Sequence, residues 1–258
     1  MFNRHFIRGG IELIPAKVPI LKFFDREGWL EVDLSVNNPT SIRNTHLLYC
    51  YSQLDYRVRP LVLAVKLWAK DHKINEARFQ TLSSYTLTLM VLHFLQAGVA
   101  PPVLPCLHNS HPSVFNDQSD IFRLDYSSLP DFQSNNRQSL GELLAGFFRY
   151  YNPRDARGFE PQQDVASVRS GDVLLAQDCE QFARQHKISP GQWRAHLLVE
   201  EPFDRTNAAR AVCNQEKWNL VSVALEATAA RVATSDSKLC MDDLSARSLF
   251  AKAGRRRH

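Results

Sequence analysis

Apolar and polar residues alternate in the first part of the chain. Lys17–Phe24 and Trp29–Val36 carry β-branched and aromatic residues, and the turn sequence Asp25–Gly28 separates them, which predicts a two-stranded hairpin. In the second strand, Leu30 and every second residue after it are apolar, whereas the residues between them are polar. One face is therefore expected to pack on a core and the other to line something polar. Because a lone hairpin is not stable, the part that would complete the sheet is expected to be missing from its N-terminal side.

A helical period replaces the alternation from Ser41 onward. Apolar residues recur every three or four positions, and Pro60 and Gly98 stand where helices commonly begin and end. The third helix is apolar on nearly all sides, which predicts the buried centre of a bundle. The predicted helices are Ser41–Tyr56, Pro60–His72, a third from the caps at Thr81–Ser84 to Ala97, Ser139–Tyr151 and Ala208–Ala233.

Polar segments rich in Pro, Ser, Asn or Asp separate some of these helices. Ala100–Asn136 predicts a long loop with short elements, and Tyr151–Gln163 predicts a second loop before a short strand at Val165–Arg169. Thr234–His258 shows no clear period and contains the basic cluster Arg255–Arg257. The whole pattern predicts an α+β protein, in which the remnant of a sheet precedes a mostly helical domain.

Composition and charge narrow the class of protein. Of the 258 residues, 44% are hydrophobic and 22% are charged, as in globular domains. The net charge of +4 is compatible with a phosphate-rich partner, but a solvated basic tail is the plainer explanation. The longest apolar run, Leu87–Leu95, is far shorter than the ~20 residues of a membrane span. Met1–Gly10 lacks the apolar region of a secretory signal, so neither a membrane nor a secreted protein is expected.

The five cysteines are scattered along the chain without paired spacing. Zinc sites and disulfide scaffolds cluster their cysteines, so neither is predicted, and a reducing compartment is favoured. The sequence also lacks a glycine-rich phosphate loop and a metalloprotease helix motif. His93, inside the third helix, is interpreted as a core histidine.

Three charged residues are candidates for phosphate or metal chemistry. Asp33 lies in mid-strand on the polar face and is either a Mg²⁺ ligand or base, or a solubility charge on an edge strand. Lys66 and Lys70 are four residues apart and project from one face of the second helix. Two such ammonium groups suit a polyphosphate, although a solvated stripe is the simpler alternative.

Polar residues near helix starts are candidates for nucleotide contacts. Ser84 opens the third helix, where free backbone N–H groups and hydroxyls can bind an anion. Tyr85 could stack on a base, or it could be a core tyrosine next to an N-cap. Asn44, on the first helix, could bond a ribose hydroxyl or face solvent.

Seven runs of residues together resemble one family. They are Ala16–Ile20, Leu30–Asn38, Ile42–Thr45, Arg57–Val62, Lys66–Lys70, Thr81–Tyr85 and Glu200–Asp204. They resemble cytoplasmic poly(A) polymerases of the germline-development type, which are relatives of the terminal uridylyltransferases. The resemblance covers Ile14–Val212 in order.

The resemblance implies a DNA polymerase β-like palm joined to a helical central domain, with the nucleotide in the cleft between them. Residues 1–40 would then be the C-terminal part of the palm, 41–233 the helical domain and 234–258 a basic, disordered tail. The implied reaction is transfer of AMP from ATP to an RNA 3′-hydroxyl, with two Mg²⁺ (or Mn²⁺) ions held by three palm carboxylates. A cytoplasmic location follows from the same resemblance.

Individual positions match the family's motifs. Asp33 matches the third metal-binding carboxylate and would be both a catalytic residue and a metal ligand. The nucleotide-binding positions would be the ribose contact Asn44, the triphosphate lysines Lys66 and Lys70, the phosphate-binding Ser84, the base-stacking Tyr85 and the acidic Glu201 near the base.

Base choice is predicted from the segment after the Glu-Pro-Phe run. Uridylyl-adding relatives carry a histidine there, whereas Asn207 stands at the matching position here, as in the adenylyl-adding branch. ATP is therefore the expected donor. No RNA-binding module such as an RRM or a zinc finger is recognisable, so an RNA-binding protein partner is expected to select the target RNA.

The family's Gly-Ser motif and first two metal carboxylates lie upstream of the Ala16–Ile20 run. Only Met1–Pro15 precedes that run here, and it contains no Asp. One carboxylate cannot hold two Mg²⁺ ions, so this polypeptide alone is expected not to transfer nucleotides. Three hypotheses follow: an adenylyltransferase whose sequence is given incompletely, a short protein that binds a nucleotide or partner without catalysis, and a uridylyltransferase.

Overall fold

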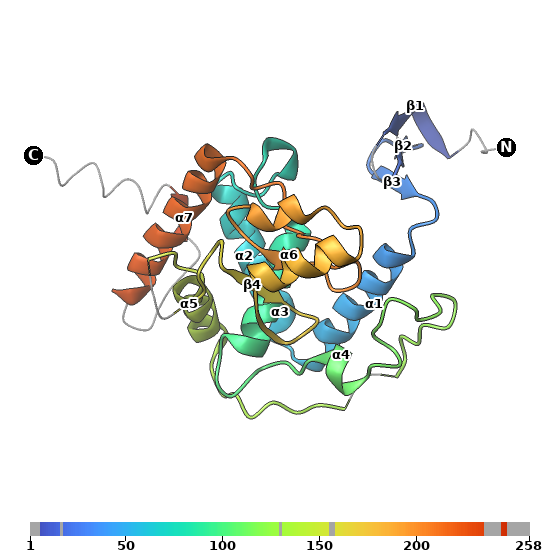
Figure 1. Ribbon diagram of the computed structural model, residues 1–258. Coiled ribbons are helices and arrows are strands. Elements are labelled where there is room, and N and C mark those ends of the chain that lie inside the picture. Colours follow the sequence, from blue (N-terminus) through green and yellow to red (C-terminus); the bar gives the residue numbers. More distant parts are fainter. Residues whose placement is uncertain (1–5, 16–17, 129–130, 155–157, 235–243, 247–258) are drawn as a thin grey trace, which may run out of the picture.

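The computed structural model describes residues 6–15, 18–128, 131–154, 158–234 and 244–246, and it places a small sheet beside a helical body (Figure 1). The sheet consists of β1 (Ile7–Ile14), β2 (Ile20–Asp25) and β3 (Glu31–Ser35), antiparallel and in that order. Three strands replace the predicted two. The sequence pattern missed β1 because its register shifts between Arg8 and Glu12, around Gly9 at φ +79°, which breaks the alternation.

The apolar face of this sheet is exposed, which corrects the expectation that it packs on a core. Leu13, Leu21 and Leu34 lie side by side across the three strands. Leu13 is 62% exposed and Leu34 36% exposed, and the flanking Leu30 is 64% exposed. The alternation predicted the two faces of β3 correctly, but it carries no information on whether another layer covers the apolar one.

Among the residues that the structure describes, the helical body contains five long helices. They are α1 (Pro39–Leu54), α2 (Val58–Asp71), α3 (Ser84–Ala97), α5 (Leu140–Tyr150) and α7 (Gln215–Ala233). The prediction for the third helix is confirmed, since α3 is buried along most of its length between α2, α5 and the second sheet. The core is aromatic as well as aliphatic, and its completely buried side chains include Trp68, Phe94, Phe147 and Phe148.

Capping side chains set where these helices begin. The Asn38 side chain accepts a hydrogen bond from Ser41 N, so α1 starts at Pro39, close to the predicted start. Ser139 and Glu142 form a capping box at the start of α5. The last helix starts at Gln215, not at Ala208, because Asn214 caps it and the preceding residues form turns.

A second, mixed sheet lies between α3 and α6 (Ala176–Gln185). It consists of β4 (Asp164–Ser167), β5 (Asp172–Leu175) and β6 (Val199–Glu200) in the order β5-β4-β6, with β6 parallel to β4. The predicted strand at Val165–Arg169 is confirmed as β4. The sequence did not predict β5 or β6, because strands of two to four residues are too short to show a period. The ten-residue helix α6 and the 3₁₀ helix η2 (Pro190–Arg194) were also not predicted.

The described residues of the long segment between α3 and α5 form a loop, as predicted, with one short helix α4 (Leu107–Ser110). The Arg57 guanidinium holds its C-terminal end, donating to Asn136 Oδ1 at 3.1 Å and to Gln138 O at 2.7 Å. The 3₁₀ helix η1 (Ala77–Phe79) connects α2 to α3. Within the described ranges, no helix has both the length and the apolar character that crossing a bilayer requires. The predicted basic tail, 234–258, lies almost entirely outside the described residues.

Candidate functional site

Side chains from three separate elements meet at the start of α3. Asn44 projects from α1, Tyr85 from the first turn of α3, and Glu201 from the residue after β6. The Tyr85 hydroxyl lies 2.6 Å from Asn44 Oδ1 and 3.0 Å from Glu201 Oε1, and Asn44 Nδ2 donates to Glu201 Oε1 at 2.6 Å. Three positions that are 41 to 157 residues apart along the sequence therefore form one hydrogen-bonded group.

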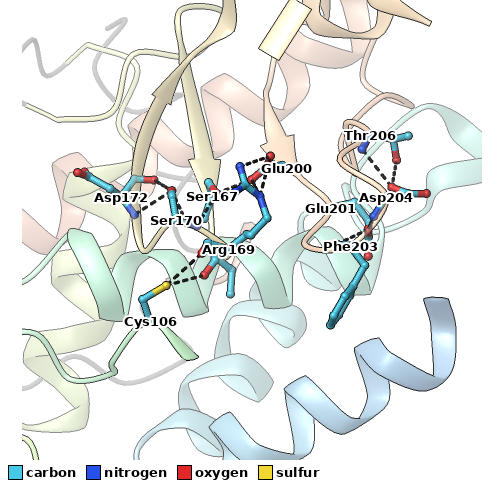
Figure 2. Close-up of polar contacts among 11 residues, drawn as sticks. Cys106, Ser167, Arg169, Ser170, Asp172, Glu200, Glu201, Phe203, Asp204 and Thr206 are labelled. Atoms are coloured by element: carbon cyan, nitrogen blue, oxygen red, sulfur yellow. Dashed lines mark hydrogen bonds and ion pairs between the residues drawn. The ribbon is translucent and has the colours of Figure 1, made fainter. Parts of the chain in front are cut away.

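Glu201 also closes the turn that follows it (Figure 2). Its second oxygen, Oε2, accepts from the backbone N–H groups of Phe203 at 2.8 Å and Asp204 at 2.5 Å. Asp204 Oδ1 in turn accepts from Thr206 N and Thr206 Oγ1. Glu201 N donates to Thr206 O at 2.8 Å, so the turn is closed at both the side-chain and the backbone level.

Burial raises the pKa values of two residues in this group. Glu201 is 6% exposed, and burial followed by the nearby Asp204 carboxylate raises its pKa. Burial, followed by the Glu201 carboxylate, raises the pKa of the Tyr85 phenol, so Tyr85 stays a neutral hydrogen-bond donor. The ring of Tyr85 is half-buried, so part of its surface stays accessible to a ligand.

The predicted phosphate-binding residues lie on neighbouring elements. Lys66 and Lys70 project from α2, which packs against α3, and no described carboxylate lies within 4.0 Å of either ammonium group. The Ser84 hydroxyl is exposed and donates to Asn75 Oδ1 at 3.2 Å. Ser83, not Ser84, is the N-cap of α3, because its side chain accepts from Thr86 N.

Asp33 is not part of the Asn44–Tyr85–Glu201 group. Its side chain is 57% exposed on β3, and its carboxylate lies 3.9 Å from Lys22 Nζ on the adjacent strand. The sheet that carries it lies away from the start of α3 (Figure 1). In the part of the chain that the structure describes, no three His, Cys, Asp or Glu side chains are grouped as metal ligands. Asp33 and the described residues around it therefore do not fit a two-metal centre.

Asn207 has a structural role, which differs from its predicted role in selecting the nucleotide base. It is completely buried, and its Oδ1 accepts from Val199 N at 3.1 Å and Ala209 N at 2.8 Å. Its Nδ2 donates to Gln192 O and Leu197 O. All four hydrogen-bonding positions of the amide are thus occupied by backbone groups, and none remains for a nucleotide.

Sequence reasoning missed the residues that shape the turn around Glu201. Asp204 and Thr206 stand two residues apart, a spacing at which an Asp side chain bonds the backbone two residues on. The sequence therefore contained a local signal for this turn. Glu200, Ser167 and Arg169, which lie behind the turn, could not be found in this way, because β4 and β6 meet only in the folded chain.

Comparison of the sequence with known proteins supports the resemblance to poly(A) polymerases. A family model described as Cid1 family poly A polymerase matches residues 139–207, and one described as mitochondrial-like poly(A) RNA polymerase, central palm domain, matches residues 3–53. The poly(A) RNA polymerase gld-2 homolog A of Drosophila melanogaster is 46% identical over 223 residues, which cover 85% of this chain and 16% of that protein. The chain thus spans only a small part of this relative's length.

Solved structures agree with the sequence matches. A chain of the GLD-2/RNP-8 complex superposes with a TM-score of 0.73 at 34% identity, covering 93% of this chain and 69% of that one. A cytoplasmic RNA terminal U-transferase superposes with a TM-score of 0.74 at 32% identity, covering 93% and 73%. The predicted α+β polymerase fold and the family resemblance are both confirmed. The chain belongs to the GLD-2 family of poly(A) RNA polymerases, among the Cid1-type nucleotidyltransferases.

Proposed function

We propose that this protein binds ATP at the group formed by Asn44, Tyr85 and Glu201 and takes part in adding adenylate to RNA 3′ ends in the cytoplasm. The observation that carries the proposal is the hydrogen-bonded contact of these three side chains, which brings an aromatic ring, an amide and a carboxylate to one place. A half-buried tyrosine ring can stack on any base, while the amide can bond a ribose hydroxyl.

The charges on α2, which packs against α3, suit a triphosphate. Lys66 and Lys70 are four residues apart on α2, and among the described residues neither has a carboxylate partner. Two such ammonium groups would bind the phosphate chain, with the exposed Ser84 hydroxyl as a further donor. The buried Glu201 would hold Asn44 and Tyr85 in position, because each of its carboxylate oxygens already accepts two hydrogen bonds within the protein.

The family implies a divalent metal, Mg²⁺ or Mn²⁺, which would stabilise charge on the transferring phosphate. Asp33 is our proposed ligand among the described residues, but it lies alone and next to Lys22. The proposal therefore concerns the binding and positioning of the nucleotide. We further propose an RNA 3′ end as acceptor and a protein partner that selects the RNA, by analogy with the complex of GLD-2 with RNP-8.

UTP is the second candidate donor, because the chain also superposes on a terminal U-transferase. The buried and saturated Asn207 does not discriminate between the two bases. The preference for ATP rests on the sequence relatives, since the poly(A) RNA polymerase gld-2 homolog A is 46% identical to this chain over 223 residues.

Calorimetric titration of the purified protein with ATP and with UTP tests the proposal. We expect ATP to bind more tightly than UTP and Tyr85→Ala to weaken the binding of both, because the ring can stack on either base. Binding of neither nucleotide at millimolar concentration would contradict the proposed site. An RNA-extension assay with each nucleotide and Mg²⁺ then distinguishes a polymerase from a module that only binds.

A further inference from the structure

A buried ion pair lies directly behind the turn that carries Glu201. Glu200, the last residue of β6, is only 2% exposed. Its carboxylate accepts from Arg169 Nη2 at 2.8 Å and from Arg169 Nε at 3.1 Å (Figure 2). Ser167 Oγ donates to the same carboxylate at 2.5 Å. Every described partner of the Glu200 carboxylate thus comes from β4 or the residues just after it.

Ser167 and Arg169 are themselves held in place. The Ser167 hydroxyl accepts a hydrogen bond from Ser170 N at 3.0 Å, which orients its proton toward Glu200. The Arg169 carbonyl accepts from the Cys106 thiol at 3.1 Å, a contact that ties this segment to the residue before α4. The donors around Glu200 are therefore fixed independently of the turn.

The strand geometry links this pair to Glu201. Ser167 pairs with Glu200 across the parallel strands β4 and β6. Consecutive side chains of a strand point to opposite sides, so a Glu200 that faces Arg169 directs Glu201 away from it, toward Asn44 and Tyr85. A bridge between Glu200 and Asn207 joins the two ends of the turn at the same point.

Stability alone is a poor explanation for such a pair. Removing two charges from water costs about as much as their attraction returns, and an apolar pair of similar size commonly stabilises a fold at least as well. A bidentate arginine–carboxylate contact does, however, fix orientation closely. The value of this pair therefore lies in where it places the backbone of β6.

We propose that Arg169 is a positioning residue for the nucleotide site: through Glu200 it sets the orientation of Glu201 and of the turn up to Thr206. This inference rests on the proposed nucleotide-binding function for its consequence, but its geometric part can be tested without any nucleotide.

Hydrogen exchange tests the geometric part. The amides of Phe203 and Asp204 donate to the Glu201 carboxylate and should exchange slowly in the wild-type protein. Arg169→Lys keeps the positive charge but loses the bidentate contact with the carboxylate. We expect about tenfold faster exchange of these two amides. Ser167→Ala, which leaves the ion pair intact, should give a smaller increase in the same direction. Wild-type exchange rates at both amides in both variants would overturn the inference.

ATP titration tests the consequence, at a temperature where circular dichroism shows each variant folded. We expect Arg169→Lys to weaken ATP binding about tenfold. The matched control is Arg194→Lys, since Arg194 Nη2 makes an exposed contact of 2.6 Å with Glu180; it should bind like wild type. The Arg169→Lys and Tyr85→Phe losses should be less than additive, because both act through Glu201.

The two proposals fail in different ways. If the wild-type protein binds no nucleotide, the proposed function fails, while the exchange experiment still decides the role of Arg169. If the wild type binds ATP and both Arg169→Lys and Ser167→Ala bind it equally well, the positioning role is refuted and the nucleotide site stands.

Discussion

The Tyr85 hydroxyl lies 3.0 Å from the Glu201 carboxylate and joins the start of α3 to the turn after β6, across 116 residues of sequence. Both groups are largely buried, and the same hydroxyl also contacts Asn44. A single phenol thus connects all three parts of the proposed nucleotide site.

Two substitutions of Tyr85 distinguish the contribution of its ring to ATP binding from that of its hydroxyl. Tyr85→Phe keeps the stacking surface but leaves Asn44 and Glu201 without their shared partner, so we expect ATP binding to weaken about three- to tenfold. Tyr85→Ala also removes the stacking, which is worth ~1–3 kcal/mol per base, and should weaken binding further. Isothermal titration measures both. Equal affinities for the Phe and Ala variants would show that the ring does not contact the base.

Lys66→Ala and Lys70→Ala should each weaken ATP binding about tenfold while leaving adenosine binding unchanged, because the lysines would contact only the phosphates. Competition titrations with ATP and adenosine measure the difference. Lys187→Asn is a suitable control, since Lys187 is exposed on another element and its φ of +58° is tolerated by Asn. Equal losses for ATP and adenosine would place the lysines elsewhere.

Asn207→Ala should lower the free energy of unfolding by roughly 2–4 kcal/mol, because it leaves the buried N–H groups of Val199 and Ala209 without acceptors. Urea denaturation measures the loss, and the exposed Asn135→Ala serves as its control. If Asn207 instead read the base, the variant would keep its stability and change its ratio of ATP to UTP affinity.

Acid should destabilise the protein through His93. Burial lowers the pKa of His93 from the usual 6.5 to about 4, and the ring contacts the Tyr150 hydroxyl at 2.9 Å. Between these two pH values the unfolded chain binds a proton that the folded chain does not, so stability falls as the pH drops from 6.5 to 4. The loss from this group is up to roughly 3 kcal/mol.

His93→Phe should flatten this pH dependence, because phenylalanine does not titrate. Urea midpoints measured between pH 4 and pH 6.5 test the expectation. An unchanged slope in the variant would show that other groups cause the acid sensitivity.

Long periodic elements could be predicted from the sequence, and the reason is physical. The helix α2 repeats its apolar positions over several turns, α3 is a long apolar run, and helix caps are local residues such as Ser83. The helical positions Asn44, Lys66, Lys70 and Tyr85 were candidates from the local pattern, and the resemblance then favoured a role for them in nucleotide binding. The contact between Asn44 and Tyr85 agrees with this prediction.

What the sequence could not provide is the environment of a residue. Asp33 and Asn207 both matched family positions, yet one lies exposed beside Lys22 and the other has every amide atom bonded to backbone. The short strands β4 and β6 are defined by pairing between segments more than 30 residues apart, which no local pattern encodes. The Arg169–Glu200 pair depends on that pairing.

The row of Leu13, Leu21 and Leu34 on the first sheet also has a practical meaning for work with this polypeptide. Exposed apolar surface promotes association, and among the described residues no strand pairs with the outer edge of β1, so concentrated samples are expected to aggregate. Dilute solutions or a mild detergent should keep the molecules apart during purification. Replacing Leu13 with Lys should reduce this aggregation, and the substitution lies outside α1, α3 and the turn at Glu201.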